Sequence, residues 1–115
     1  MSEYLILIYE SESNPEPSEE EMGRWFGVTE EMQKAGVMVA GEALHPTSSA
    51  TTVRVRDGRT LTTDGPFAET KEQLGGFYLI ECANLDEALA WAAKMPNVGR
   101  GSMEVRPVMD FSQEQ

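Results

Sequence analysis

The stretch GFYLIECANLDEALAWAAKMP, residues 76–96, contains a strand and the helix that follows it. Phe77–Cys82 is apolar on both faces, which is typical of a strand that is covered on both sides of a sheet. Asn84 lies three residues before Glu87, the spacing at which a side-chain cap begins a helix. Pro96 ends the predicted helix. Its inner face is expected to consist of Leu85, Ala88, Leu89 and Ala92.

The N-terminal part of the chain has the same strand–helix–strand order. Tyr4–Tyr9 is again apolar on both faces, and Ser18 with Glu21 predicts the capped start of a helix that stops at Gly36. The acidic first turn of this helix indicates stabilisation by the helix dipole and a solvated face. Val37–Leu44 is the next strand. The inward stripe of the helix is expected to be Met22, Trp25, Phe26, Met32 and Ala35.

Between these two units, apolar and polar residues alternate on both sides of Asp57-Gly58. This pattern is a strong β-hairpin signal, because both residue types adopt the backbone conformation of a tight turn. The last strand is expected within Gly101–Met109. The order predicts one domain, residues 1–115, with a ferredoxin-like α+β sandwich of the dimeric α+β barrel type. Its antiparallel sheet would carry two helices on one face and an inserted β-hairpin.

The two doubly apolar strands also predict a homodimer. Two helices can cover only one face of the sheet, and the chain has no further element for the other face. A second copy of the chain is the simplest cover, packed through sheet faces or edges. The alternative is that the hairpin folds back over the sheet. This alternative is less favoured because Arg54, Arg56 and Arg59 make the hairpin polar.

The chain has a formal net charge of −11, from 20 acidic and 9 basic residues. This balance argues against nucleic acid and against an anionic membrane surface as partners, since both attract clustered positive charge. Its longest apolar run, Tyr4–Tyr9, is far shorter than the ~20 residues of a membrane-spanning helix. No basic segment precedes that run, so neither a signal peptide nor a membrane anchor is expected. The single cysteine, Cys82, predicts a cytoplasmic protein in which this residue belongs to the core.

The sequence Asp64-Gly65-Pro66-Phe67 predicts a sharp corner after the hairpin. The Asp64 carboxylate can accept hydrogen bonds from backbone N–H groups just ahead of it, and Gly65 and Pro66 both favour a turn. Phe67 is then expected to anchor the corner in the core. On this interpretation the motif is structural.

The region after the corner also has the density of polar groups that is typical of binding loops. A structural alternative is a short helical turn capped by Thr70 and Gln73. Arg106 is a further candidate, because alternation along the last strand can turn it toward a cleft at a dimer seam. The candidate ligand-binding residues are Gly65, Pro66, Phe67, Glu69, Lys71, Glu72 and Arg106.

His45 is the only histidine and lies at the end of the second predicted strand, where it can meet Asp64 across neighbouring strands. An aspartate partner fixes the tautomer of an imidazole and strengthens it as a general base. Asp64 and His45 are therefore the candidate catalytic pair. The sequence shows neither a cluster of metal ligands nor a phosphate-binding loop, and no cofactor is expected.

Four segments resemble the DGPF-domain branch of the YCII-related family. The most specific is DGPFAETKEQLGGFY, Asp64–Tyr78, and the others are GVMVAGEALHP, DEALAWAAKMP and MEVRPVM. The resemblance covers nearly the whole chain. It implies a dimeric ferredoxin-like α+β fold and a family whose biochemical role is mostly unassigned.

The wider family, by the same resemblance, includes small lyase- or isomerase-like enzymes with a histidine–aspartate pair. That histidine belongs to the first helix and the aspartate lies near the end of the second. This chain departs at both places, because residues 19–35 contain no histidine and Met95 precedes Pro96 where the aspartate would lie. The DGPF branch is often encoded beside extracytoplasmic-function sigma factors, which implies a regulatory partner.

Three hypotheses about function follow from these observations. The first is a small cytoplasmic homodimer that binds a small polar or aromatic ligand or a protein partner, linked to sigma-factor signalling. The alternative is a small lyase- or isomerase-like enzyme that performs acid–base chemistry at Asp64 with His45. The third is a corner with a purely structural role. The missing family dyad favours the binding module.

Overall fold

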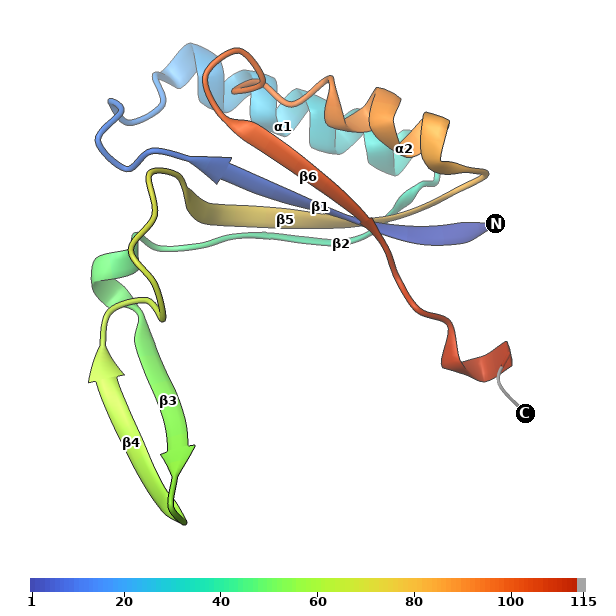
Figure 1. Ribbon diagram of the computed structural model, residues 1–115. Coiled ribbons are helices and arrows are strands. Elements are labelled where there is room, and N and C mark those ends of the chain that lie inside the picture. The colour runs from blue at the N-terminus through green and yellow to red at the C-terminus, as the bar shows by residue number, and fades with distance from the viewer. Residues whose placement is uncertain (114–115) are drawn as a thin grey trace.

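The computed structural model describes residues 1–113 and has two layers, an open antiparallel sheet and two helices on one of its faces (Figure 1). The strand order β2-β5-β1-β6, with a helix between β1 and β2 and another between β5 and β6, confirms the ferredoxin-like α+β prediction. The sheet does not close into a barrel. The elements of this body are β1 (Ser2–Glu10), α1 (Glu19–Lys34), β2 (Met38–Ala43), β5 (Gln73–Cys82), α2 (Leu85–Ala92) and β6 (Ser102–Pro107).

Both helices begin at the residues that the sequence predicts. The Ser18 hydroxyl accepts a hydrogen bond from the backbone N–H of Glu21 at 3.1 Å. The side-chain oxygen of Asn84 accepts a hydrogen bond from the backbone N–H of Glu87 at 3.0 Å. Each cap satisfies a donor that the first turn of a helix leaves without a partner. Within residues 1–113, no helix is long and apolar enough to cross a membrane.

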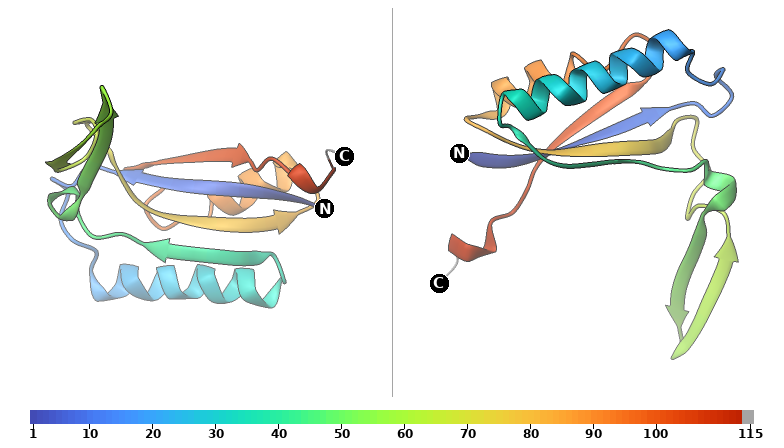
Figure 2. Two further views of the ribbon diagram at one scale, coloured as in Figure 1. Left: turned by 90° about the horizontal axis from the view of Figure 1, so that it is seen from below. Right: turned by 180° about the vertical axis from the view of Figure 1, so that it is seen from behind.

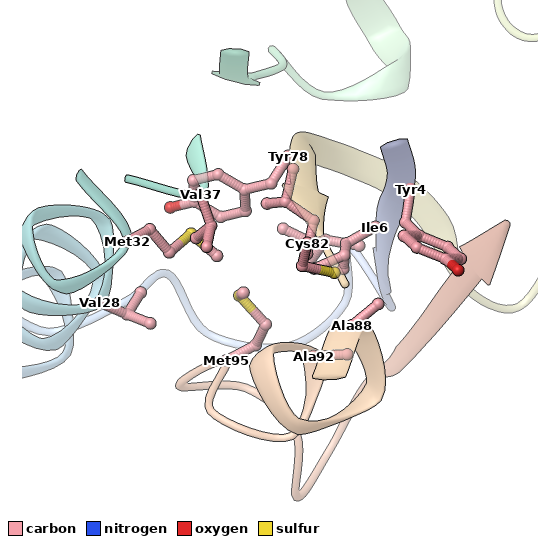
Figure 3. Close-up of a cluster of buried hydrophobic side chains, with 12 residues drawn as sticks. Tyr4, Ile6, Val28, Met32, Val37, Tyr78, Cys82, Ala88, Ala92 and Met95 are labelled. Atoms are coloured by element: carbon pink, nitrogen blue, oxygen red, sulfur yellow. The ribbon is translucent and has the colours of Figure 1, made fainter. Parts of the chain in front are cut away.

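The hydrophobic core lies between the sheet and the two helices (Figure 3). The side chains of Met32 from α1, Met95 beyond α2 and Cys82 from β5 point into this space. Cys82 is fully buried, which confirms that it is a core residue. The sheet contributes alternate residues, because successive side chains of a strand point to opposite faces. From β1 and β5 these are Tyr4, Ile6, Ile8, Tyr78, Ile80 and Cys82.

The predicted helix stripes are only partly correct. Met32 is buried as expected, but Phe26 is 69% exposed and Leu89 of α2 is 47% exposed. The small residues Ala88 and Ala92 make the buried face of α2, so its backbone lies close to the sheet and its leucines stay at the rim. The N-terminal half of α1 stands over a groove, described below, instead of over packed core.

The inserted hairpin forms a separate sheet of its own, β3 (Thr51–Arg56) paired with β4 (Arg59–Asp64). Asp57 and Gly58 have φ values of 53° and 74°, which confirms the predicted tight turn. The hairpin does not fold back over the body. It projects to the side of the sheet opposite the helices, as Figure 1 and the right view of Figure 2 show.

The face of the sheet without helices, called the helix-free face below, is apolar at its centre. Leu5 and Leu7 of β1 and Phe77 and Leu79 of β5 lie on it and are half-buried. They alternate with the core residues of the same strands, as doubly apolar strands predict. Within residues 1–113, neither a helix nor another strand covers this face (Figure 2).

Candidate functional site

A groove with a volume of about 510 Å³ lies between the N-terminal half of α1 and the end of the sheet made by β2 and β5. Volumes of this size are typical of small-molecule sites. The segments 11–17 and 44–46 form its ends. Its floor includes Gly41, Gly75, Gly76 and Tyr78, and its helical wall includes Glu21, Met22, Trp25, Phe26 and Thr29.

Gly76 keeps the floor of the groove low. A Cβ atom at this position would lie 2.8 Å from the carbonyl oxygen of Glu42 on the neighbouring strand. Because that atom belongs to the backbone, the clash could be relieved only by moving β2 away from β5. Glycine here therefore permits the close approach of the two strands beneath the site.

The hydroxyl of Tyr78 is held at the groove by a hydrogen-bond chain. The Thr29 hydroxyl donates to the backbone carbonyl of Trp25 at 3.0 Å, and the oxygens of Thr29 and Tyr78 are 2.6 Å apart. Since Thr29 has only one proton to donate, Tyr78 is the donor in the second bond. This chain fixes the aromatic ring of Tyr78 between α1 and β5.

Two carboxylates and one guanidinium form a partly buried network beside the groove, which we call the acid–arginine cluster: Glu10, Glu21 and Arg100. Nε of Arg100 donates to Glu10 at 2.8 Å, and its Nη2 donates to Glu21 at 2.5 Å. The side-chain amide of Asn97 donates to the other oxygen of Glu10 at 2.9 Å. The indole N–H of Trp25 donates to Glu21 at 3.2 Å, which joins the cluster to the groove wall.

The cluster keeps both carboxyl groups ionised. Burial by itself raises the pKa of Glu10, but hydrogen bonds from Arg100, Asn97 and Asn14 outweigh it, and the pKa lies below its ordinary value. The hydrogen bond from Arg100 lowers the pKa of Glu21 more than burial raises it. The same contacts raise the pKa of Arg100. One cation therefore holds two anions, and the network keeps a net negative charge.

The prediction that the acidic first turn of α1 is a solvated face is wrong for Glu21. Its side chain reaches Arg100, 79 residues away, and the residue is only 6% exposed. No local pattern identifies a partner so distant in the chain. The spacing of residues along α1 does indicate that Glu21 is buried. It lies seven residues before Val28 and eleven before Met32, and so shares their buried face of the helix.

The lining of the groove is acidic. Glu12 accepts hydrogen bonds from the backbone N–H and the hydroxyl of Thr47, at 2.7 and 2.6 Å. His45 is the only basic side chain in the lining and is exposed. The acidic residues are Glu10, Glu12, Glu16, Glu21 and Glu42.

The structure places the two candidate catalytic residues in different surroundings. His45 lines the groove, whereas Asp64 is exposed at the end of β4, opposite Thr51 of β3. Among residues 1–113, neither a hydrogen bond nor an ion pair joins the two side chains. The catalytic pair stays a prediction.

The corner after the hairpin is fastened to β3 instead of to the core. The N–H of Gly65 donates to the carbonyl of Ala50 at 2.7 Å, and the Thr52 hydroxyl donates to the carbonyl of Gly65 at 2.8 Å. Arg54 donates to the carbonyl of Phe67 at 3.1 Å. Phe67 itself is 79% exposed, so the predicted core anchor is wrong. The physical reason is that the corner belongs to a hairpin that projects away from the core.

The charged residues beyond the corner do not form a helical turn, so that structural alternative is wrong. The Thr70 hydroxyl donates to the carbonyl of Glu72 at 2.6 Å, and the side chain of Gln73 donates to the carbonyl of Thr70. Glu72 is half-buried and accepts a hydrogen bond from Ser102 of β6 at 2.7 Å. Glu69 and Lys71 are exposed.

The remaining candidates also lie apart from the groove. Gly65 and Pro66 are half-buried at the base of the hairpin. Arg106 of β6 donates to Glu104 at 3.0 Å on the same strand. None of the seven predicted ligand-binding residues contributes to the groove lining. Within residues 1–113, no three His, Cys, Asp or Glu residues are grouped to hold a metal ion.

Comparison with known proteins assigns the family. The pattern of the YCII-related domain matches residues 2–112 of this chain. An uncharacterized protein from Rhizobium meliloti (strain 1021) is 45% identical over 112 residues, which cover 91% of this chain and 90% of that protein. A match of this extent includes every helix and strand of the sheet and the hairpin. The chain therefore belongs to the YCII-related family.

Proposed function

We propose that this protein is a binding module for a small molecule with an apolar or aromatic body and a positively charged group. The observation that carries the proposal is the groove of about 510 Å³ between α1 and the sheet. Aromatic walls and several carboxylates meet there. Sites for small organic molecules combine an apolar lining with a few placed polar groups in this way.

The walls favour the apolar part of such a ligand. Trp25 and Phe26 come from α1, and Tyr78 comes from β5. Phe26 is 69% exposed in the protein alone, and covering its ring with a ligand removes apolar area from water. Rings at the edge of a groove also attract a cation through their π faces.

The carboxylates favour the charged part. Arg100 neutralises one of the two charges of Glu10 and Glu21, so these two leave a net negative charge next to Trp25. Glu16 lines one end of the groove and is exposed. An anionic ligand would be repelled by this lining, whereas an ammonium or amidinium group would be attracted.

Calorimetry with two probes of similar shape and opposite charge tests this proposal: phenethylamine and 3-phenylpropionate. We expect the amine to bind more tightly than the carboxylate and to change the emission of Trp25 in a Trp91→Phe background. Glu16→Gln should weaken amine binding by up to roughly fivefold, because an exposed ion pair contributes about 1 kcal/mol or less. Glu69→Gln, which changes an exposed carboxylate outside the groove, should leave it unchanged.

Two results would contradict the proposal. Equal affinity for the amine and the carboxylate would show that the charge of the groove selects nothing. A loss of binding in Glu69→Gln but not in Glu16→Gln would place the site at the segment after the corner, where the sequence alone predicts it.

Acid–base catalysis by Asp64 with His45 is the alternative function. One observation favours it, namely that His45 lines the same groove. Asp64 lies at the base of the hairpin, outside the lining. The link to sigma-factor signalling and the cytoplasmic location stay predictions.

A further inference from the structure

The helix-free face of the sheet is flanked at both ends by segments that project from it. The hairpin β3–β4 leaves the body at one end, and the C-terminal segment 108–113 leaves it at the other, both on the side away from the helices (Figures 1 and 2). A hollow of about 370 Å³ lies at the C-terminal segment, and we call it the end hollow. Its lining is Met1, Ser2, Glu3, Glu81, Val108, Met109, Asp110 and Phe111.

We propose that the β3–β4 hairpin is a docking arm that inserts into the end hollow of a second copy of this chain. Two copies would face each other across their helix-free faces, and each hairpin would fill the hollow of its partner. This inference goes beyond the binding function of the groove and does not depend on it.

The hairpin itself calls for a partner. Two-stranded hairpins are at best marginally stable alone in water, and this one pairs with no other strand of residues 1–113. Val53 and Val55 are 61% and 58% exposed on one face of the hairpin, and Leu61 is 48% exposed on the other. Exposed apolar side chains on a projecting element are typical of a contact site.

Charge complementarity identifies the occupant. Arg54, Arg56 and Arg59 give the hairpin three of the nine basic residues in a chain that has 20 acidic ones. The end hollow carries the opposite charge, because Glu3, Glu81 and Asp110 line it.

The apolar surfaces match as well. Met109 is 70% exposed and Phe111 is 65% exposed at the hollow, where the valines of the hairpin could cover them. The valines and the arginines lie on opposite faces of the hairpin. The end hollow therefore offers apolar side chains to one face of the inserted arm and negative charge to the other.

The dimensions allow the contact. A strand of six residues, such as β3 or β4, is about 20 Å long at ~3.3 Å per residue, and two sheets pack face to face about 10 Å apart. An arm of this length reaches past the sheet of a partner. Because arm and hollow lie at opposite ends of the face, a two-fold rotation brings each arm to the other copy's hollow and closes the assembly at two chains.

The same arrangement covers the apolar centre of the helix-free face. Leu5 and Leu7 of β1 would pack against the partner's sheet together with Phe77 and Leu79 of β5. Burial of these half-exposed side chains supplies the non-directional part of the association, whereas the arms determine the orientation of the two copies.

Charge reversal on each side of the contact tests the proposal by sedimentation equilibrium. Arg56→Glu/Arg59→Glu changes the arm near its turn, and Glu3→Lys/Glu81→Lys changes two residues that are paired across β1 and β5 in the hollow. We expect the parent chain to be a dimer and each variant to raise the dimer Kd at least tenfold. The control Arg24→Glu/Lys34→Glu reverses two exposed charges on α1, on the helix side, and should leave the Kd unchanged.

The chain that carries all four arm and hollow substitutions restores the complementary charges and should dimerise like the parent. A mixture of the arm variant and the hollow variant should form a heterodimer. In one of its two contacts the charges of both arm and hollow are reversed, and in the other neither is changed, so both contacts stay complementary. Native mass spectrometry distinguishes the heterodimer by mass. Far-UV circular dichroism establishes that each variant is folded.

Three outcomes would overturn the inference. A parent chain that is monomeric at tens of micromolar has no such contact. A dimer whose Kd is insensitive to the arm and hollow substitutions forms through another surface. Loss of dimerisation without recovery in the fourfold variant would show that the arm and the hollow do not meet.

Discussion

The corner at residues 64–67 and the acid–arginine cluster are assembled from the chain in opposite ways. The corner is four consecutive residues, and its hydrogen bonds run to β3 of the same hairpin. The cluster joins residues from β1, α1 and the segment before β6, and Glu10 and Arg100 are 90 positions apart in the sequence. Phe67 at the corner is 79% exposed, whereas Glu21 in the cluster is 6% exposed. A motif that is dense in the sequence here marks local backbone geometry, and the dispersed residues form the buried polar network.

This difference has an energetic consequence. Buried charges are costly to leave without a partner, whereas exposed side chains at a turn contribute little. Substitutions in the cluster should therefore reduce stability much more than substitutions of side chains at the corner.

The largest effect is expected from Arg100→Met. It keeps the aliphatic stem but leaves Glu10 and Glu21 without their cation, two carboxylates next to each other. A fully buried pair would lose 3–5 kcal/mol, and we expect about 2 kcal/mol because the Arg100 side chain is 37% exposed. Urea unfolding at pH 7 measures the loss. The control Arg24→Met breaks an exposed ion pair with Glu20 and should lower the free energy of unfolding by less than about 0.5 kcal/mol. An equal loss of stability in both variants would contradict the special role of the cluster.

The pH dependence of stability should depend on the same arginine. The pKa of Glu10 and the pKa of Glu21 are lowered from 4.5 in the folded protein. The unfolded chain therefore takes up protons first, so this part of the stability is present above about pH 4.5 and is lost as the pH falls below it. In Arg100→Met the strongest cause of the lowering is gone. The difference in unfolding free energy between parent and variant should shrink from pH 7 to pH 3, and a constant difference would contradict it.

The parts of the fold that depend on neighbouring residues could be predicted from the sequence. Both helix caps, the Asp57-Gly58 turn and the order of helices and strands along the chain follow from signals within a few residues of each element. Periodicity also identified which residues share a face. It could not show whether that face is covered, and this is why Phe26, expected in the core, lies on the wall of a groove.

The candidate site was harder to predict for a related reason. Charge density directed attention to the segment after Asp64, but density along the chain says nothing about which side chains the fold brings together. The groove depends on the distance between α1 and β2, and the cluster depends on Arg100 reaching two earlier elements. Of the predicted site residues, His45 lines the groove because it closely follows β2, the strand that forms its edge.

The smallest effects are expected at the corner, where two adjacent substitutions separate backbone from side chain. Gly65 has a φ of 100°, a conformation that other residues rarely adopt, so Gly65→Ala should cost about 1 kcal/mol. Asp64→Asn keeps the shape of an exposed side chain and should change stability by less than about 0.5 kcal/mol. Urea unfolding of both variants measures the contribution of the Gly65 backbone conformation against that of the Asp64 carboxylate. A larger loss in Asp64→Asn than in Gly65→Ala would mean that the carboxylate holds the corner, and the contrast with the acid–arginine cluster would then disappear.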